Sequence, residues 1–137
     1  MAQLKSLSAS VSVGPQLQPS DMAVLAAQGY ASVINNRPDD EEAGQPSSSE
    51  VEAAATAAGL AYLHAPIRGM PEDQAVARVA ERLKADADAN ARTAMFCRSG
   101  MRSTAAWAMA QRLDGADADN LRAAAASAGY DLSRLPL

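Results

Sequence analysis

The chain has 137 residues, enough for a single domain spanning 1–137 with its own core, and 48% of the residues are hydrophobic although only 4% are aromatic. A formal net charge of −4 argues against general binding to nucleic acid, which requires a basic face. No apolar run approaches the roughly 20 residues that cross a bilayer, and the N-terminus lacks a signal-peptide pattern, so we expect a cytoplasmic protein without a membrane partner.

Apolar, strand-like runs alternate with helical patterns along the chain. In chain order we expect a strand at 11–13, a helix at 19–28, a strand at 31–35, a polar loop at 37–49, a helix at 49–58, a strand at 60–65, a helix at 71–87, a strand at 93–96 and helices at 103–113 and 117–128. Three of these helices are followed by a glycine, which is typical of a helix end, and Ser47 or Ser48 is suited to cap the second helix.

Strands separated by helices pair in parallel through right-handed crossovers. The pattern therefore predicts a three-layer α/β domain with a mostly parallel sheet of four or five strands flanked by helices. In such a sheet the ligand site lies beyond the carboxyl ends of the strands. We expect three loops to meet there: 36–39, 66–69 and the loop that begins at Cys97. Gln16 and the turn before it are a further candidate for this face.

Cys97 is the only cysteine, and it begins a loop that reads Cys-Arg-Ser-Gly-Met-Arg-Ser. A strand, a glycine-containing loop and a helix present backbone N–H groups to an anion. The helix N-terminus and the two arginines should lower the pKa of the thiol, and the thiolate is the nucleophile. We expect Cys97 and Arg102 to be catalytic, and the rest of the loop to bind substrate, with Ser103 also capping the helix: Arg98, Ser99, Gly100, Met101 and Ser103.

Three reactions use a thiolate in such a loop: phosphate-ester hydrolysis, sulfur transfer through a persulfide, and reduction of an oxidised substrate. Cysteine phosphatases of the protein-tyrosine-phosphatase class carry His-Cys, five residues and then an arginine that clamps the phosphoryl oxygens. Here Phe96 precedes the cysteine and Arg102 comes one residue early. The loop resembles instead that of rhodanese-type sulfurtransferases, whose shorter ring of amides surrounds sulfur. A ring sized for a persulfide is tight for a phosphoryl group, so the spacing favours sulfur transfer.

Several further blocks are similar to a bacterial family, the beta-lactamase hydrolase-like, phosphatase-like domain. They are 14–17, 32–39, 41–46, 97–107 and 128–132. The resemblance implies a dual-specificity-phosphatase-like fold, the Cys97 loop as the site, and an activity assigned to phosphatases or to sulfurtransferases. It also places Asn36 and Arg37 among the substrate-binding residues.

The remaining polar residues have ordinary structural explanations. Glu72 and Asp73 follow Pro71, so the first turn of a helix suits them better than the role of general acid. The acidic run 39–42 is expected to be a solvated loop, because its consecutive carboxylates lack the spacing of a calcium site. We interpret His64 as a structural histidine and Trp107 as core packing. With one cysteine and one histidine, neither a metal nor a cofactor is expected.

The sequence thus predicts a thiol-dependent sulfurtransferase. Cys97 would take sulfur from a small anionic donor, thiosulfate or a persulfide, and pass it to an external thiol or cyanide, since the chain has no second cysteine. The alternatives are a phosphatase that forms a cysteinyl phosphate from a phosphate ester, and a module that binds anions or partners without catalysis.

Overall fold

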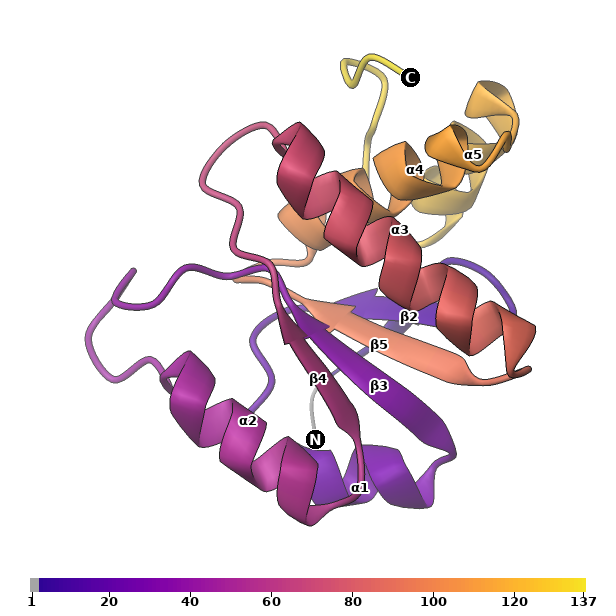
Figure 1. Ribbon diagram of the computed structural model, residues 1–137. Helices are drawn as coiled ribbons and strands as arrows, with labels where there is room; N and C mark the ends of the chain where they lie inside the picture. The colour runs from indigo at the N-terminus through magenta and orange to yellow at the C-terminus, as the bar shows by residue number, and fades with distance from the viewer. Residues whose placement is uncertain (1–2) are drawn as a thin grey trace.

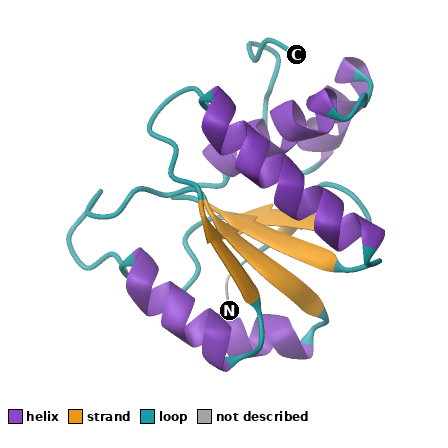
Figure 2. Ribbon diagram, viewed as in Figure 1, coloured by secondary structure: helices purple, strands orange, loops and turns teal. Residues whose placement is uncertain are grey.

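The computed structural model describes residues 3–137, which form a five-stranded sheet between two layers of helices (Figures 1 and 2). The strands are β1 (Lys5–Ser6), β2 (Val11–Gly14), β3 (Tyr30–Asn35), β4 (Ala61–His64) and β5 (Arg92–Phe96). Their order in the sheet is β1-β2-β5-β3-β4, and every neighbouring pair is parallel except β1 with β2. The predicted parallel strands are confirmed, whereas β1 was not predicted, because two residues are too few to show an alternating pattern.

Helices α1 (Asp21–Ala27) and α2 (Ser48–Ala57) cover one face of the sheet (Figure 1). The other face is covered by α3 (Asp73–Asp88), α4 (Met101–Leu113) and α5 (Ala118–Ser127). Helix α2 begins where expected, because Ser47 and Glu50 form a capping box. Helix α4 begins two residues earlier than predicted. No helix within residues 3–137 is both long and apolar enough to cross a membrane.

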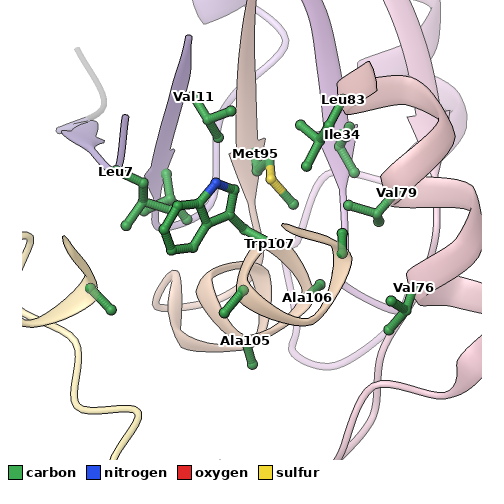
Figure 3. Close-up of a cluster of buried hydrophobic side chains, with 14 of the residues drawn as sticks. Leu7, Val11, Ile34, Val76, Val79, Leu83, Met95, Ala105, Ala106 and Trp107 are labelled. Carbon is green, nitrogen blue, oxygen red and sulfur yellow. The ribbon is translucent and has the colours of Figure 1, made fainter. Parts of the chain in front are cut away.

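Each face of the sheet has its own hydrophobic cluster. On the face of α3, α4 and α5, the side chain of Trp107 is only 3% exposed and packs near Leu7, Val11 and Met95 (Figure 3). The interpretation of Trp107 as core packing is therefore confirmed. The other cluster is built mainly from α1, α2 and the opposite side of the strands. Burial on both faces explains why the central strands are apolar along their length.

The parallel strands end in one row. Phe96 at the end of β5 lies in register with Gly14 of β2 and with Asn35 of β3, and Asn35 lies in register with His64 of β4. The segments that follow these four residues therefore all start at the same edge of the sheet. This is the edge at which the sequence predicted the site.

Candidate active site

Cys97 directly follows β5, and its side chain is buried at the base of the loop. The backbone N–H of Gly100 donates a hydrogen bond to its Sγ at 3.1 Å. Gly100 is in the left-handed region, with φ of 99°, and serves as the N-cap of α4. This conformation turns the chain tightly enough to point the amide back at the sulfur. The thiol is thus held against an N–H donor at the positive end of a helix, as the sequence predicted.

The C-terminal segment closes over this loop. The hydroxyl of Tyr130, three residues after α5, donates to the backbone oxygen of Ser99 at 3.0 Å. A Cβ atom at Gly100 would overlap the Tyr130 hydroxyl. Burial, and then the charge of Cys97, raises the pKa of Tyr130, so its hydroxyl stays protonated as a donor. Local sequence gave no sign of this contact, because the two residues are far apart in the chain.

Arg102 joins three loops. One of its nitrogens, Nη1, donates to Oε2 of Glu41 at 2.8 Å and to the backbone oxygen of Ile67 at 2.7 Å, and Nη2 donates to Oε1 of Glu41 at 2.7 Å. The hydrogen bond to Glu41 and, after it, the charge of Cys97 raise the pKa of Arg102, although burial opposes them. The loops after β3, β4 and β5 therefore meet at this guanidinium, as predicted.

Glu41 departs from the expectation that residues 39–42 form a solvated acidic loop, because it alone of the four is not exposed. Glu41 pairs with Arg102 and also accepts a hydrogen bond from Nε of Arg37 at 3.0 Å. Glu42 pairs with Arg37 at 3.2 Å and with Arg98 at 3.5 Å. The hydrogen bond to Arg102, followed by that to Arg37, lowers the pKa of Glu41 from 4.5 to about 2. The pairing with Arg98 and Arg102 was not visible in the sequence, because these arginines lie more than 50 residues away along the chain.

Arg37 and Arg98 stand at different depths in the site. Arg37 is almost fully buried, and its Nη1 donates to Oε1 of Gln16 at 3.0 Å, which confirms that Gln16 reaches this face. The Arg98 side chain is 63% exposed and lies at the rim beside Glu42. Substrate contact by either arginine remains a prediction. His64 makes a hydrogen bond through its Nε2 to the backbone oxygen of Arg37 at 2.8 Å, so the structural role expected for His64 is confirmed.

Asn36 and Ser103 connect the start of α4 to the segments that follow β3 and β4. Both are fully buried, and the Ser103 hydroxyl donates to Oδ1 of Asn36 at 2.8 Å. The Asn36 amide group donates in turn to the backbone oxygen of Ala65 at 2.9 Å. The expectation that Ser103 caps the helix was wrong, because Gly100 is the N-cap and Ser103 lies within the first turn. The direct roles of both side chains in substrate binding remain predictions.

Two further loop residues face outward. Ser99 is exposed, and its hydroxyl accepts from the N–H of Met101 at 3.3 Å, while the Met101 side chain is 38% exposed.

The carboxylates outside the loop have structural positions. Glu72 and Asp73 lie at the N-cap and first residue of α3, as expected. Within residues 3–137, no group of three or more His, Cys, Asp or Glu side chains is placed to hold a metal ion.

The arrangement suits a substitution reaction on an anionic substrate. A thiol is held against an N–H donor, and the guanidinium of Arg102 lies close enough for its pKa to respond to the charge of Cys97. Glu41, the carboxylate bound to Arg102, is ionised at neutral pH because its pKa is about 2. It therefore has no proton to give to a leaving group.

Known proteins share both the sequence and the fold. The sequence profile of the family described as "Beta-lactamase hydrolase-like protein, phosphatase-like domain" matches residues 3–114. A beta-lactamase hydrolase-like protein of Xylella fastidiosa (strain Temecula1) is 32% identical over 125 residues, which are 90% of this chain and 28% of that relative. The chain thus spans about a quarter of the length of the curated relatives that it matches.

Solved structures place the fold among the cysteine phosphatases. A candidate phosphatase from Neisseria meningitidis has a TM-score of 0.75 and 26% identity, over 94% of this chain and 90% of that one. Tk-PTP in its active form has a TM-score of 0.71 and 15% identity, over 92% and 84%. The identity to Tk-PTP is low, so this likeness concerns the fold, which is that of dual-specificity and tyrosine phosphatases, as the sequence predicted.

Proposed function

This chain belongs to the beta-lactamase hydrolase-like, phosphatase-like domain family, and we propose that it is an enzyme whose nucleophile is Cys97 and whose substrates are small anions. The observation that carries this proposal is the hydrogen bond from the Gly100 N–H to Sγ at 3.1 Å, beside Arg102. Such a donor stabilises a thiolate and the negative charge that develops when the sulfur attacks an anionic group.

For the group that is transferred, we propose sulfur. The Cys97 thiolate attacks the outer sulfur of a donor such as thiosulfate, the S–S bond of the donor breaks, and sulfite leaves with its bonding electrons. Cys97 then carries a persulfide, which passes to an external thiol or cyanide. Two features support this chemistry: the arginine lies five positions after the cysteine, and the ionised Glu41 has no proton to donate. Sulfite needs no proton to leave.

Phosphate-ester hydrolysis is the second candidate, and the comparisons support it more directly than they support sulfur transfer. The family is described as phosphatase-like, and the Neisseria meningitidis structure is a candidate phosphatase. In that reaction Cys97 would form a cysteinyl phosphate and Arg102 would hold the phosphoryl oxygens. An ester whose alcohol leaves readily without protonation, such as an aryl phosphate, suits a site where the carboxylate nearest Arg102 is ionised.

The test is to give the purified protein thiosulfate with cyanide in one assay and 4-nitrophenyl phosphate in another. We expect thiocyanate formation, and a gain of one sulfur atom in the intact mass after thiosulfate that a thiol reverses. Both should vanish in Cys97→Ser. The matched pair Arg102→Lys and Arg68→Lys tests the arginine, because Arg68 is an exposed arginine in the neighbouring loop. Only Arg102→Lys should lose activity, by about 100-fold or more, because lysine cannot make the bidentate hydrogen bonds of a guanidinium.

Each remaining outcome decides between the candidates. Turnover of the phosphate alone, abolished by Cys97→Ser, would replace sulfur transfer with phosphatase activity. Turnover of neither substrate by a folded protein whose Cys97 does not react with either would leave the anion-binding module as the function.

A further inference from the structure

A pocket of about 290 Å³ opens beside the Cys97 loop. Its walls come from three parts of the chain: the segment between β4 and α3, the first turns of α4, and the C-terminal segment. We call it the apolar pocket, after the six side chains that make most of its lining: Met70, Pro71, Met101, Ala105, Leu132 and Leu135. The C-terminal segment, yellow in Figure 1, follows α5 and supplies the last two.

Two methionines at the pocket are unusually exposed. The Met70 side chain is 58% exposed and that of Met101 is 38% exposed. Both are among the most exposed large hydrophobic residues of the described chain. Methionine is flexible and adapts its shape to what it contacts, so the two side chains are suited to line a binding pocket.

The apolar pocket is continuous with the reactive loop. Met101 contributes its backbone N–H to the loop, where it donates to the Ser99 hydroxyl, while its side chain lines the pocket. Arg102 also lines the pocket, and its guanidinium feels the charge of Cys97. A molecule whose anionic end binds Arg102 and faces Cys97 therefore has its adjacent atoms next to the pocket.

The charges around the pocket set the orientation of such a molecule. Arg102 lies on the side of the Cys97 loop, while Asp131 and Arg134 belong to the C-terminal segment. Hydrogen bonds from the backbone and hydroxyl of Ser133, with the charge of Arg134, hold the pKa of Asp131 below its ordinary value, so Asp131 and Arg134 carry opposite charges at this end of the pocket. An uncharged organic group therefore suits this end, while the group that Cys97 attacks lies on the side of Arg102.

We propose that the apolar pocket holds the uncharged organic group of the substrate, so that the preferred donor is an organic thiosulfonate or a molecule of similar shape rather than inorganic thiosulfate. This rests on the proposed function. In the reaction the Cys97 thiolate takes the outer sulfur of R–SO₂–S⁻, and the sulfinate R–SO₂⁻ leaves with the electrons of the broken S–S bond. Cavities of about 150 Å³ hold benzene, so a pocket of about 290 Å³ has room for an aromatic ring.

The first experiment measures binding without turnover. In Cys97→Ser, the affinities of benzenesulfonate and methanesulfonate are compared by NMR titration, since both carry the same anionic head. We expect benzenesulfonate to bind at least fivefold more tightly. Met70→Gln and Met101→Gln, which keep side-chain size but add polarity, should each reduce this preference to about twofold or less. Leu113→Gln is the matched control, because Leu113 is a 69% exposed residue at the other end of α4.

The second experiment uses the enzyme with Cys97 intact. Benzenethiosulfonate should be turned over with a kcat/KM at least fivefold above that of methanethiosulfonate, and Met70→Gln should remove this difference. Equal affinity for the two sulfonates, or binding of neither, would overturn the assignment of the pocket. A preference for benzenesulfonate without turnover of either thiosulfonate would support the pocket and contradict the sulfur-transfer function instead.

Discussion

At the scale of single residues, the site is a chain of alternating arginines and glutamates. Arg102 and Arg37 share Glu41, while Arg37 and Arg98 share Glu42. Arg37 is buried, and a buried guanidinium requires such partners, because its desolvation is otherwise costly. The same pairs aim the Arg102 guanidinium before any substrate arrives, so less side-chain freedom is lost on binding.

The pKa of Glu41 gives this network a measurable pH dependence. Because that pKa is lowered from 4.5 to about 2, the pair stabilises the fold above pH 4.5, and this stabilisation is lost as the pH falls toward 2. Glu41→Gln should lower the free energy of unfolding by about 1–2 kcal/mol at pH 6, a figure reduced to allow for the partial exposure of the pair. Urea denaturation at a series of pH values measures it, and the difference from wild type should shrink below pH 4.5.

Glu52→Gln serves as the control for this experiment, because Glu52 is an exposed glutamate on α2 that lies outside the site. Its effect should be within about 0.5 kcal/mol at all pH values. A loss of stability in Glu41→Gln that stays constant from pH 6 to pH 2 would contradict the assigned role of the carboxylate.

Gly100 is required both for its backbone conformation and for the space above it. Alanine there adds the strain of a positive φ and also overlaps the Tyr130 hydroxyl. Gly115 has a similar φ of 92° with nothing within 4 Å of a Cβ, so Gly115→Ala reports the strain alone. We expect Gly115→Ala to cost about 1 kcal/mol and to leave activity intact. Gly100→Ala should lower the free energy of unfolding by at least about 1 kcal/mol more than Gly115→Ala does, and it should abolish activity. Urea denaturation measures the first effect, and the thiosulfate and 4-nitrophenyl phosphate assays measure the second.

Equal effects of the two substitutions would mean that Tyr130 does not restrict the loop.

The contacts of this loop also show how much of the site the sequence can predict. The residue types and spacing of 97–103 were sufficient to predict the thiol, its amide donor and its arginine. The contact with Tyr130 and the pairing of Glu41 with Arg102 depend on the folded arrangement of distant segments, which a single sequence does not display.

At the scale of elements, one buried carboxylate of α3 bonds to two strands of the sheet, in addition to the apolar contacts of this helix. Asp86 accepts hydrogen bonds from the hydroxyls of Ser32 on β3 and Thr93 on β5, at 3.0 and 2.6 Å, and from Arg82 at 2.9 Å. It is only 4% exposed, so these donors replace water almost completely. The helical period of 71–87 was visible in the sequence, but this anchor was not, because an aspartate near a helix end is usually solvent-exposed.

Removal of the Asp86 carboxylate should therefore be costly. Asp86→Ala leaves two buried hydroxyls and an arginine without their acceptor, and we expect a loss of about 2–4 kcal/mol in the free energy of unfolding. Asp88→Ala is the control on the same helix, since Asp88 is exposed and its pair with Lys84 spans 3.8 Å. Urea denaturation of both variants makes the comparison, and equal losses would show that the buried anchor contributes nothing specific.

Element boundaries differed from the predictions where backbone contacts outweigh periodicity. Helix α4 starts at Met101 because the Gly100 carbonyl accepts from both the N–H and the hydroxyl of Thr104, at 2.9 and 2.8 Å. Strand β1 exists because Lys5 and Ser6 pair antiparallel with Val13 and Ser12 of β2. Neither interaction produces a hydrophobic pattern, so pattern alone placed the start of the helix late and overlooked the strand.

At the scale of the whole molecule, the site depends on parts of the chain beyond the family match at residues 3–114. Helix α5 and the segment after it belong to the same hydrophobic cluster as Trp107, and Tyr130 reaches back to the Cys97 loop. The parallel pairing of the strands, with the sheet between two helical layers, followed from the alternation of strands and helices. The packing of α5 and the following segment against α4 could not be predicted in this way, since it depends on which faces of alanine-rich helices meet.

Leu121 tests whether this last part and the site form one cooperative unit. It lies on α5, is 6% exposed and packs in the cluster that contains Trp107, away from the apolar pocket. Leu121→Ala should lower the free energy of unfolding by about 2–4 kcal/mol through the cavity it leaves. Trp107 fluorescence and the reactivity of Cys97 toward a thiol reagent should report the same shifted urea midpoint. The control is Leu113→Ala, because Leu113 is an exposed leucine on α4, and this substitution should change the urea midpoint little. Two separate midpoints would show that α5 unfolds independently of the site, because a shared core unfolds in a single transition.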